Sequence, residues 1–161
     1  MQFFEDLEVG KVERFGAYEV TLAEVLDFAG KYDPQPFHLS DEAAAKTHFG
    51  RISASGWHTC AMTMRMIVDH FAANAMASLG SPGVDEIKWH RPVYPGDVLT
   101  CEGELLDKRQ SLSKPEIGLT RSATRVYNQH GVMVMSHIAN AMIRVRGDAA
   151  QAPHSSAPSA E

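Results

Sequence analysis

One short segment of the chain, DPQPFH at residues 33–38, places a carboxylate and an imidazole among prolines. A proline fixes its own φ and keeps the preceding residue out of the helical region, so Asp33 and Gln35 are restricted along with the prolines. Asp33 and His38 therefore do not stack on one helix face. A stiff loop can still bring both side chains to one point, because little backbone entropy remains to be lost.

A carboxylate and an imidazole that hold one water molecule form a general acid–base pair. The pKa of histidine lies near neutrality, whereas Asp33 needs burial in an apolar pocket to raise its pKa toward the working pH. Such a pair can add water across a polarised double bond or remove it. The structural alternative is that Asp33 starts a turn by bonding to its own backbone, while His38 caps the next helix or lies on the surface.

The elements that hold this segment begin with a strand predicted at residues 12–20. The next segment, residues 21–33, contains a predicted helix. Thr21 is its N-cap, and its C-terminal end is expected at Gly30. A second short helix is predicted after the prolines, with Ser40 as its N-cap.

The longest helical pattern covers residues 57–80 and is apolar around most of its circumference, which predicts a helix wrapped by other elements. Its expected end is at Gly80. Four strands with sensible turns then follow, and hairpins are predicted at Pro95-Gly96 and at NQHG, residues 128–131. The predicted strands are 84–93, 97–107, 118–128 and 132–145.

This order of elements predicts an α+β fold of the hot-dog type, in which a five-stranded antiparallel sheet wraps around a long apolar central helix. Such a sheet leaves an edge strand and an apolar face, for which a homodimer is the natural remedy. We expect one domain over residues 1–146, followed by a disordered tail rich in Ala, Pro and Ser at 147–161.

Composition excludes several classes of protein. A net charge of −5 and a pI of about 5.9 argue against a nucleic-acid binder. Cys60 and Cys101 form no C-x-x-C motif, so a disulfide framework or zinc site is not expected and the compartment is predicted to be reducing.

The N-terminus lacks a secretory pattern, and charged residues interrupt the apolar stretch at 59–79, which indicates a cytoplasmic protein rather than a membrane protein. The histidine spacing gives no paired ligand face, so a metal is not expected. No cofactor is expected either.

The stretch FAGKYDPQPFH resembles the hydratase motif of the MaoC-like (R)-specific enoyl-CoA hydratases, in which Asp33, Pro36 and His38 match the aspartate, proline and histidine. The chain also resembles two later segments of the family, in the stretches HFGRISASGWHT and IKWHRPVYPGDVL. The resemblance covers about residues 10–146. The family fold is the hot dog. The chain departs from the motif at Gln35, where Asn is usual, and at Lys31-Tyr32.

The resemblance implies reversible hydration of a trans-2-enoyl-CoA thioester to a 3-hydroxyacyl-CoA. Asp33 would activate water and His38 would hold it and assist proton transfer. The Gly56 N–H would stabilise the thioester oxygen, beside the small Ser55, which stands where many members carry His. Trp57 would join the methionines at 62, 64 and 66 in lining an acyl tunnel.

Two alternatives stay open. A hot-dog acyl-CoA thioesterase would need a carboxylate on the central helix, where Asp69 is the only acidic residue and lies well past the N-terminus. A non-catalytic acyl-CoA-binding protein would keep the fold without the chemistry. The candidates for binding CoA phosphates are Arg51, Arg65, Arg91, Arg121, Arg125, Arg144 and Arg146.

Overall fold

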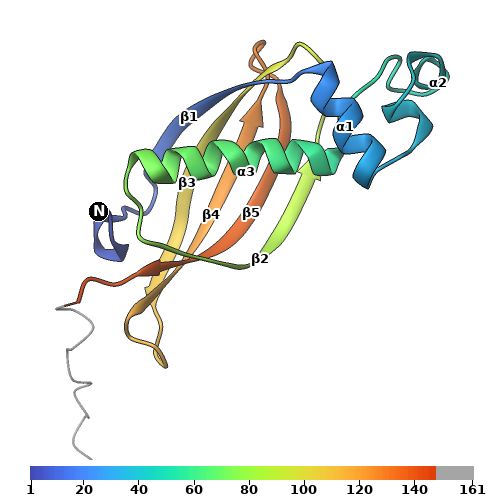
Figure 1. The fold of residues 1–161 in the computed structure, drawn as a ribbon. Coiled ribbons are helices and arrows are strands. Elements are labelled where there is room, and N and C mark those ends of the chain that lie inside the picture. The colour runs from blue at the N-terminus through green and yellow to red at the C-terminus, as the bar shows by residue number, and fades with distance from the viewer. Residues whose placement is uncertain (148–161) are drawn as a thin grey trace, which may run out of the picture.

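A five-stranded antiparallel sheet curls around one long helix in the computed structural model, which describes residues 1–147 (Figure 1). The strands lie in the order β1-β3-β4-β5-β2, so β1 and β2 form the two edges. This confirms the predicted hot-dog fold. The strands are β1 (Val12–Glu19), β2 (Ser78–Trp89), β3 (Val98–Gln110), β4 (Ile117–Tyr127) and β5 (Met133–Arg144). The helices are η1 (Phe4–Asp6), α1 (Leu22–Tyr32), η2 (Pro36–His38), α2 (Asp41–Ala45) and α3 (Gly56–Ala73).

The hairpin predicted at Pro95-Gly96 is wrong. A turn does form there, because the Asp97 N–H donates to the Tyr94 carbonyl at 3.0 Å and Gly96 has a φ of +94°. However, β2 pairs with β5, and β3 pairs with β1 and β4, so this turn ends a crossover from one sheet edge toward the other. Turn residues indicate where the chain changes direction, but they do not determine which strands pair. The hairpin predicted at 128–131 is confirmed by the pairing of β4 with β5.

Two helix ends differ from the prediction. α1 continues through Gly30 to Tyr32 and stops where Asp33 precedes a proline, which disfavours a further helical residue. α3 stops at Ala73, because Asn74 caps it and Ala75 takes a φ of +48°. The following residues join β2, whose pairing with β5 begins at Ser78, instead of prolonging the helix.

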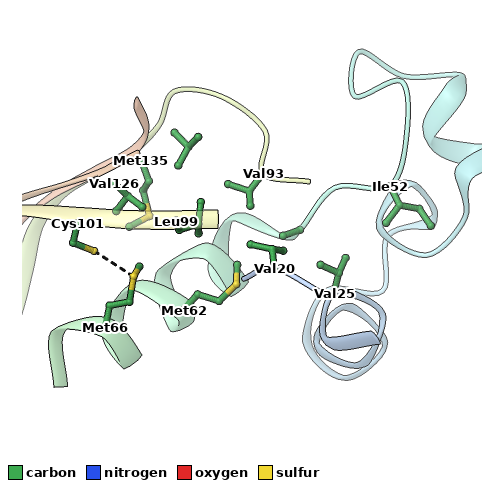
Figure 2. Close-up of a cluster of buried hydrophobic side chains, with 12 residues drawn as sticks. Val20, Val25, Ile52, Met62, Met66, Val93, Leu99, Cys101, Val126 and Met135 are labelled. Carbon is green, nitrogen blue, oxygen red and sulfur yellow. Dashed lines mark hydrogen bonds between the residues drawn. The ribbon is translucent and has the colours of Figure 1, made fainter. Parts of the chain in front are cut away.

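The core lies between α3 and the concave face of the sheet (Figure 2). Met62 and Met66 project from α3 toward Leu99 and Cys101 of β3, and all four side chains are buried. Burial raises the pKa of the Cys101 thiol to about 12, so this cysteine is an inert core residue. The cluster extends to Val20, Val25, Ile52, Ala54, Val93, Val126, Val134 and Met135, which attach the α1 region and the 50–55 loop to the sheet.

The sheet wraps around α3 as predicted, but part of the helix surface stays uncovered in the single chain. Trp57, Met64 and Val68 remain 59%, 54% and 51% exposed, because the sheet covers one side of the helix only. Val84 and Trp89, on the edge strand β2, are also half exposed. The described chain thus carries apolar surface on α3 and on an unpaired sheet edge.

No helix within residues 1–147 combines the length and apolar character needed to cross a membrane. The predicted tail lies outside the described residues, apart from Gly147.

Gly16→Ala should destabilise the fold measurably. Gly16 lies in the irregular stretch of β1 with a φ of +79°, and a Cβ there would clash with the Met66 sulfur. We expect the free energy of unfolding to fall by about 2–4 kcal/mol, from backbone strain plus overpacking. Gly10→Ala is the matched control, because Gly10 has a φ of +83° but no atom within 4 Å of the position that an alanine methyl would take. Urea unfolding should show a loss of only about 1 kcal/mol for that control, and equal losses would contradict the Met66 contact.

Candidate active site

The proline segment forms a tight corner at the end of α1. Asp33 is the C-cap of α1, and its N–H donates to the Ala29 carbonyl at 3.0 Å. The Gln35 N–H then donates to the Asp33 carbonyl at 2.8 Å, and the His38 N–H to the Gln35 carbonyl at 2.9 Å. Pro36 occupies the first position of η2, where a missing N–H costs nothing. The corner therefore presents Asp33 and His38 on the same side, as the sequence predicted.

His38 is held in one orientation and one tautomer. Its side chain is buried, and Nδ1 lies 2.7 Å from the Ser53 carbonyl oxygen. A carbonyl only accepts, so Nδ1 carries the proton and donates. Nε2 then faces Asp33 Oδ2 at 3.5 Å. In the neutral imidazole this nitrogen is an acceptor, so two acceptors face each other across the site.

The carboxylate of Asp33 is fixed through both of its oxygens. The Ser55 hydroxyl donates to Oδ2 at 2.6 Å, and the Gln35 side-chain amide donates to Oδ1 at 2.7 Å. Gln35 thus holds the carboxylate directly, and the replacement of Asn in the family motif leaves the corner intact.

The pKa of Asp33 differs from the sequence expectation. Burial by itself raises the pKa of this carboxyl, but the hydrogen bonds from Ser55 and Gln35 and the nearby His38 outweigh burial, so the pKa lies below its ordinary value of 3.8. The sequence expectation of a raised pKa considered burial and could not include the two donors. Asp33 is consequently a carboxylate at neutral pH.

Ser55→Ala should raise the pKa of Asp33, because burial remains while the short hydrogen bond to Oδ2 is lost. A depressed folded pKa means that Asp33 stabilises the fold above pH 3.8 and loses this effect as the pH falls through the lowered value. In Ser55→Ala that loss should move to higher pH. A carboxyl ¹³C titration followed by NMR measures the shift.

The control for this variant is Ser40→Ala, since Ser40 caps α2 as Ser55 caps α3 but makes no contact with Asp33. Each variant should lose about 1 kcal/mol of stability as a lost N-cap. An unchanged Asp33 pKa in Ser55→Ala would show that this hydroxyl does not set the charge state.

Gly56 presents a free N–H beside the pair. It is the first residue of α3, and within residues 1–147 its N–H donates to no acceptor. The Ser55 carbonyl accepts the Thr59 N–H at 3.0 Å and so points along the helix. Because N–H and C=O are antiparallel in a trans peptide, the Gly56 N–H points out of the helix N-terminus, where the helix dipole favours negative charge.

Carboxylate, imidazole and backbone N–H thus meet where the end of α1 reaches the start of α3. The first two can exchange protons with a bound water, and the third can stabilise a developing oxyanion. Among residues 1–147, no three His, Cys, Asp or Glu side chains are arranged to hold a metal ion.

Residues 7–126 match the family model described as "MaoC like domain". The chain belongs to the MaoC-like dehydratase family. The crystal structure of the MaoC-like dehydratase from Rhodospirillum rubrum is 36% identical, covers 91% of this chain and 99% of that one, and has a TM-score of 0.80. The uncharacterized protein YdeM of Bacillus subtilis is 28% identical over 87% of this chain and 97% of its own length. The 3-hydroxybutyryl-CoA dehydratase of Methylorubrum extorquens is 31% identical over 65% of this chain and 64% of its own length.

Trp57 does not join the other four predicted site residues of this MaoC-like chain. Its ring lies on the surface, edge-on to Trp89 with centroids 5.4 Å apart. The three methionines predicted to line the tunnel lie on different sides of α3. Met62 and Met66 are in the core, whereas Met64 is on the outer side of the helix. The structure therefore does not bring Trp57 and the three methionines to one tunnel wall within the single chain.

Sequence reasoning missed three parts of the site. The Ser53 carbonyl carries no sequence signal, because any residue supplies a carbonyl. Comparison with the family motif marks Gln35 as a departure and gives no sign that its amide donates to the carboxylate. Trp89 donates its indole N–H to the Gly56 carbonyl at 2.9 Å, and only its place in the family-like segment IKWHRPV pointed to this region.

Proposed function

We propose that this MaoC-like protein catalyses the reversible hydration of a trans-2-enoyl-CoA to a 3-hydroxyacyl-CoA. The observation that carries the proposal is the pair of facing acceptors, Asp33 Oδ2 and His38 Nε2 at 3.5 Å, beside the unpartnered Gly56 N–H. A water molecule that donates one O–H to each acceptor satisfies both, and it is the second reactant of a hydration.

In the forward direction, Asp33 is ionised, because its pKa is lowered, and so is ready to accept a proton, although it is a weaker base than a carboxylate with a raised pKa. It takes the proton from this water as the water oxygen adds to the β-carbon of the enoyl group. Negative charge moves to the thioester oxygen, which accepts the Gly56 N–H. The proton then passes to the α-carbon with assistance from His38, which restores both side chains. A backbone donor of this kind is typically worth about 3–4 kcal/mol of transition-state stabilisation.

The thioester is assigned to CoA by two lines of support. The relative from Methylorubrum extorquens is named for a CoA thioester. In addition, Arg51 and Arg91 flank the site in sequence and pair with no carboxylate within residues 1–147; Arg51 lies over the Tyr94 ring, 4.0 Å from its centroid. By contrast, Arg65, Arg121, Arg125 and Arg146 are each paired with Asp or Glu. Arg144 also has no carboxylate partner within residues 1–147, but it ends β5 opposite Ile117, at the far end of the sheet from Trp89. We assign Arg51 and Arg91 to the CoA phosphates.

We further propose that the working form is a homodimer. A second copy would bury the exposed apolar surface of α3 and pair with the free edge of β2, which would extend the sheet. The free thiols of Cys60 and Cys101 support the proposed cytoplasmic location.

No observation favours the thioesterase alternative. Asp69 is exposed, is paired with Arg65 at 2.9 Å, and follows Gly56 by thirteen residues, which is about 20 Å along a helix. A non-catalytic binding protein would not need the fixed Asp33–His38 pair, so this alternative does not explain it.

The testing experiment mixes the protein with trans-2-enoyl-CoAs of several chain lengths and follows loss of the conjugated thioester absorbance. A parallel thiol-trapping assay detects release of free CoA. We expect formation of 3-hydroxyacyl-CoA without free CoA. Release of CoA with no hydroxyacyl product would establish a thioesterase, and the absence of both would favour the binding protein.

A further inference from the structure

The indole of Trp89 contacts Gly56 at two points. Its Nε1–H donates to the Gly56 carbonyl at 2.9 Å, although the two residues are 33 positions apart. A Cβ on Gly56 would lie 2.6 Å from the ring carbon Cε2 and 2.8 Å from Nε1. The indole therefore occupies the space that a side chain at position 56 would need.

A glycine at the first position of a helix has an intrinsic weakness as a hydrogen-bond donor to substrate. It has no Cβ to restrict its backbone, and the first helical N–H groups have no intrahelical acceptor. On one side of Gly56, the Ser55 carbonyl is anchored by the Thr59 N–H. On the other side, the Gly56 carbonyl receives the Trp89 indole N–H. The peptide plane before the glycine is thus held by the first turn of α3, and the plane after it receives an added hydrogen bond from β2.

Trp89 is well placed for this role because its backbone is held in the sheet, although its side chain is half exposed. It is the last residue of β2 and pairs with Met135 of β5. Its ring is also braced edge-on by the ring of Trp57 at 5.4 Å. Rigid elements hold functional groups more accurately than loops do.

We propose that Trp89 is a positioning residue, which orients the Gly56 N–H for the thioester oxygen and restricts position 56 to glycine. This inference rests on the proposed function for its catalytic consequence, but the effect on the Gly56 backbone does not depend on any activity. Trp89 touches no reacting atom in this assignment. It acts through the backbone of Gly56.

Trp89→Phe tests the proposal, since it keeps an aromatic ring and removes the indole N–H. We expect kcat for hydration to fall about tenfold, a fraction of the loss from removing an oxyanion donor, with KM within about twofold of the original. In ¹⁵N relaxation of the full chain, the order parameter of the Gly56 amide should drop from about 0.85 toward 0.6.

The matched control is Tyr18→Phe, which removes another hydrogen bond made by an aromatic side chain, from the Tyr18 hydroxyl to the Glu24 carboxylate at 2.9 Å. This control should leave both kcat and the Gly56 order parameter unchanged even if it lowers stability. An unchanged Gly56 order parameter in Trp89→Phe would overturn the proposal whatever the activity. A lowered order parameter with unchanged kcat would overturn the catalytic consequence. If the original protein hydrates no enoyl thioester, the proposed function fails, and the relaxation measurement alone decides whether Trp89 orders Gly56.

Discussion

Asp33→Asn is expected to lower kcat for hydration by about 10³–10⁴-fold, the upper part of the range for loss of a general base. The amide keeps the size of the carboxylate and can still accept the Ser55 hydroxyl, so the corner at the end of α1 should survive. What is lost is the capacity to take a proton from water. Steady-state kinetics with the best enoyl-CoA substrate, together with thermal unfolding, separate the loss of chemistry from a loss of fold.

Asp27→Asn is the control for this variant. It makes the same carboxylate-to-amide change on the same helix, but Asp27 is exposed, and within residues 1–147 its carboxylate pairs only with Lys31, at 2.8 Å. Activity should stay within about twofold, because an exposed ion pair of this kind contributes 1 kcal/mol or less. Full hydratase activity in Asp33→Asn would mean that another group removes the proton.

His38→Asn is expected to lower kcat by about 10²–10³-fold, again within the range for an acid–base group. The asparagine amide can reproduce the donor that bonds the Ser53 carbonyl, but it places nothing at the position of Nε2. Water would then be held by Asp33 alone, and transfer of the proton to the α-carbon would lose its assistance. The measurement is single-turnover hydration at saturating enzyme, which reports the chemical step.

His48→Asn makes the same substitution ten positions along the chain at an exposed histidine and should leave the rate unchanged. Comparable losses in both variants would assign the effect to general disturbance of residues 36–50. A loss in His38→Asn that is confined to KM would remove His38 from the chemical step.

The sequence predicted the order of elements well because the relevant signals are local. Hydrophobic period, caps and turn residues located β1, α1, α2 and the last three strands to within a few residues. The errors arose where long-range pairing decides the outcome. Residues 78–80 are compatible with helix, but their pairing with β5 and the left-handed Ala75 convert them to strand.

In the site, too, the contacts between residues close in sequence could be predicted, whereas the contacts between distant residues could not. Asp33 and His38 were predicted together because only four residues, two of them prolines, separate them. The contact of Ser55 with Asp33 joins residues 22 apart, and the contact of Trp89 with Gly56 joins residues 33 apart. No local rule places such pairs, so the depressed pKa of Asp33 and the restraint on Gly56 emerge only from the tertiary structure.

The double fixation of Asp33 has a stereochemical consequence. With Gln35 on Oδ1 and Ser55 on Oδ2, the carboxylate cannot turn, and water bound between it and His38 approaches a substrate from one side only. A substrate whose thioester oxygen is held by Gly56, and whose acyl chain is held in one orientation, presents one prochiral face to that water. In the proposed reaction the new carbinol centre is therefore formed with a single handedness, which depends on the two hydrogen bonds that fix the carboxylate as well as on the orientation of the acyl chain.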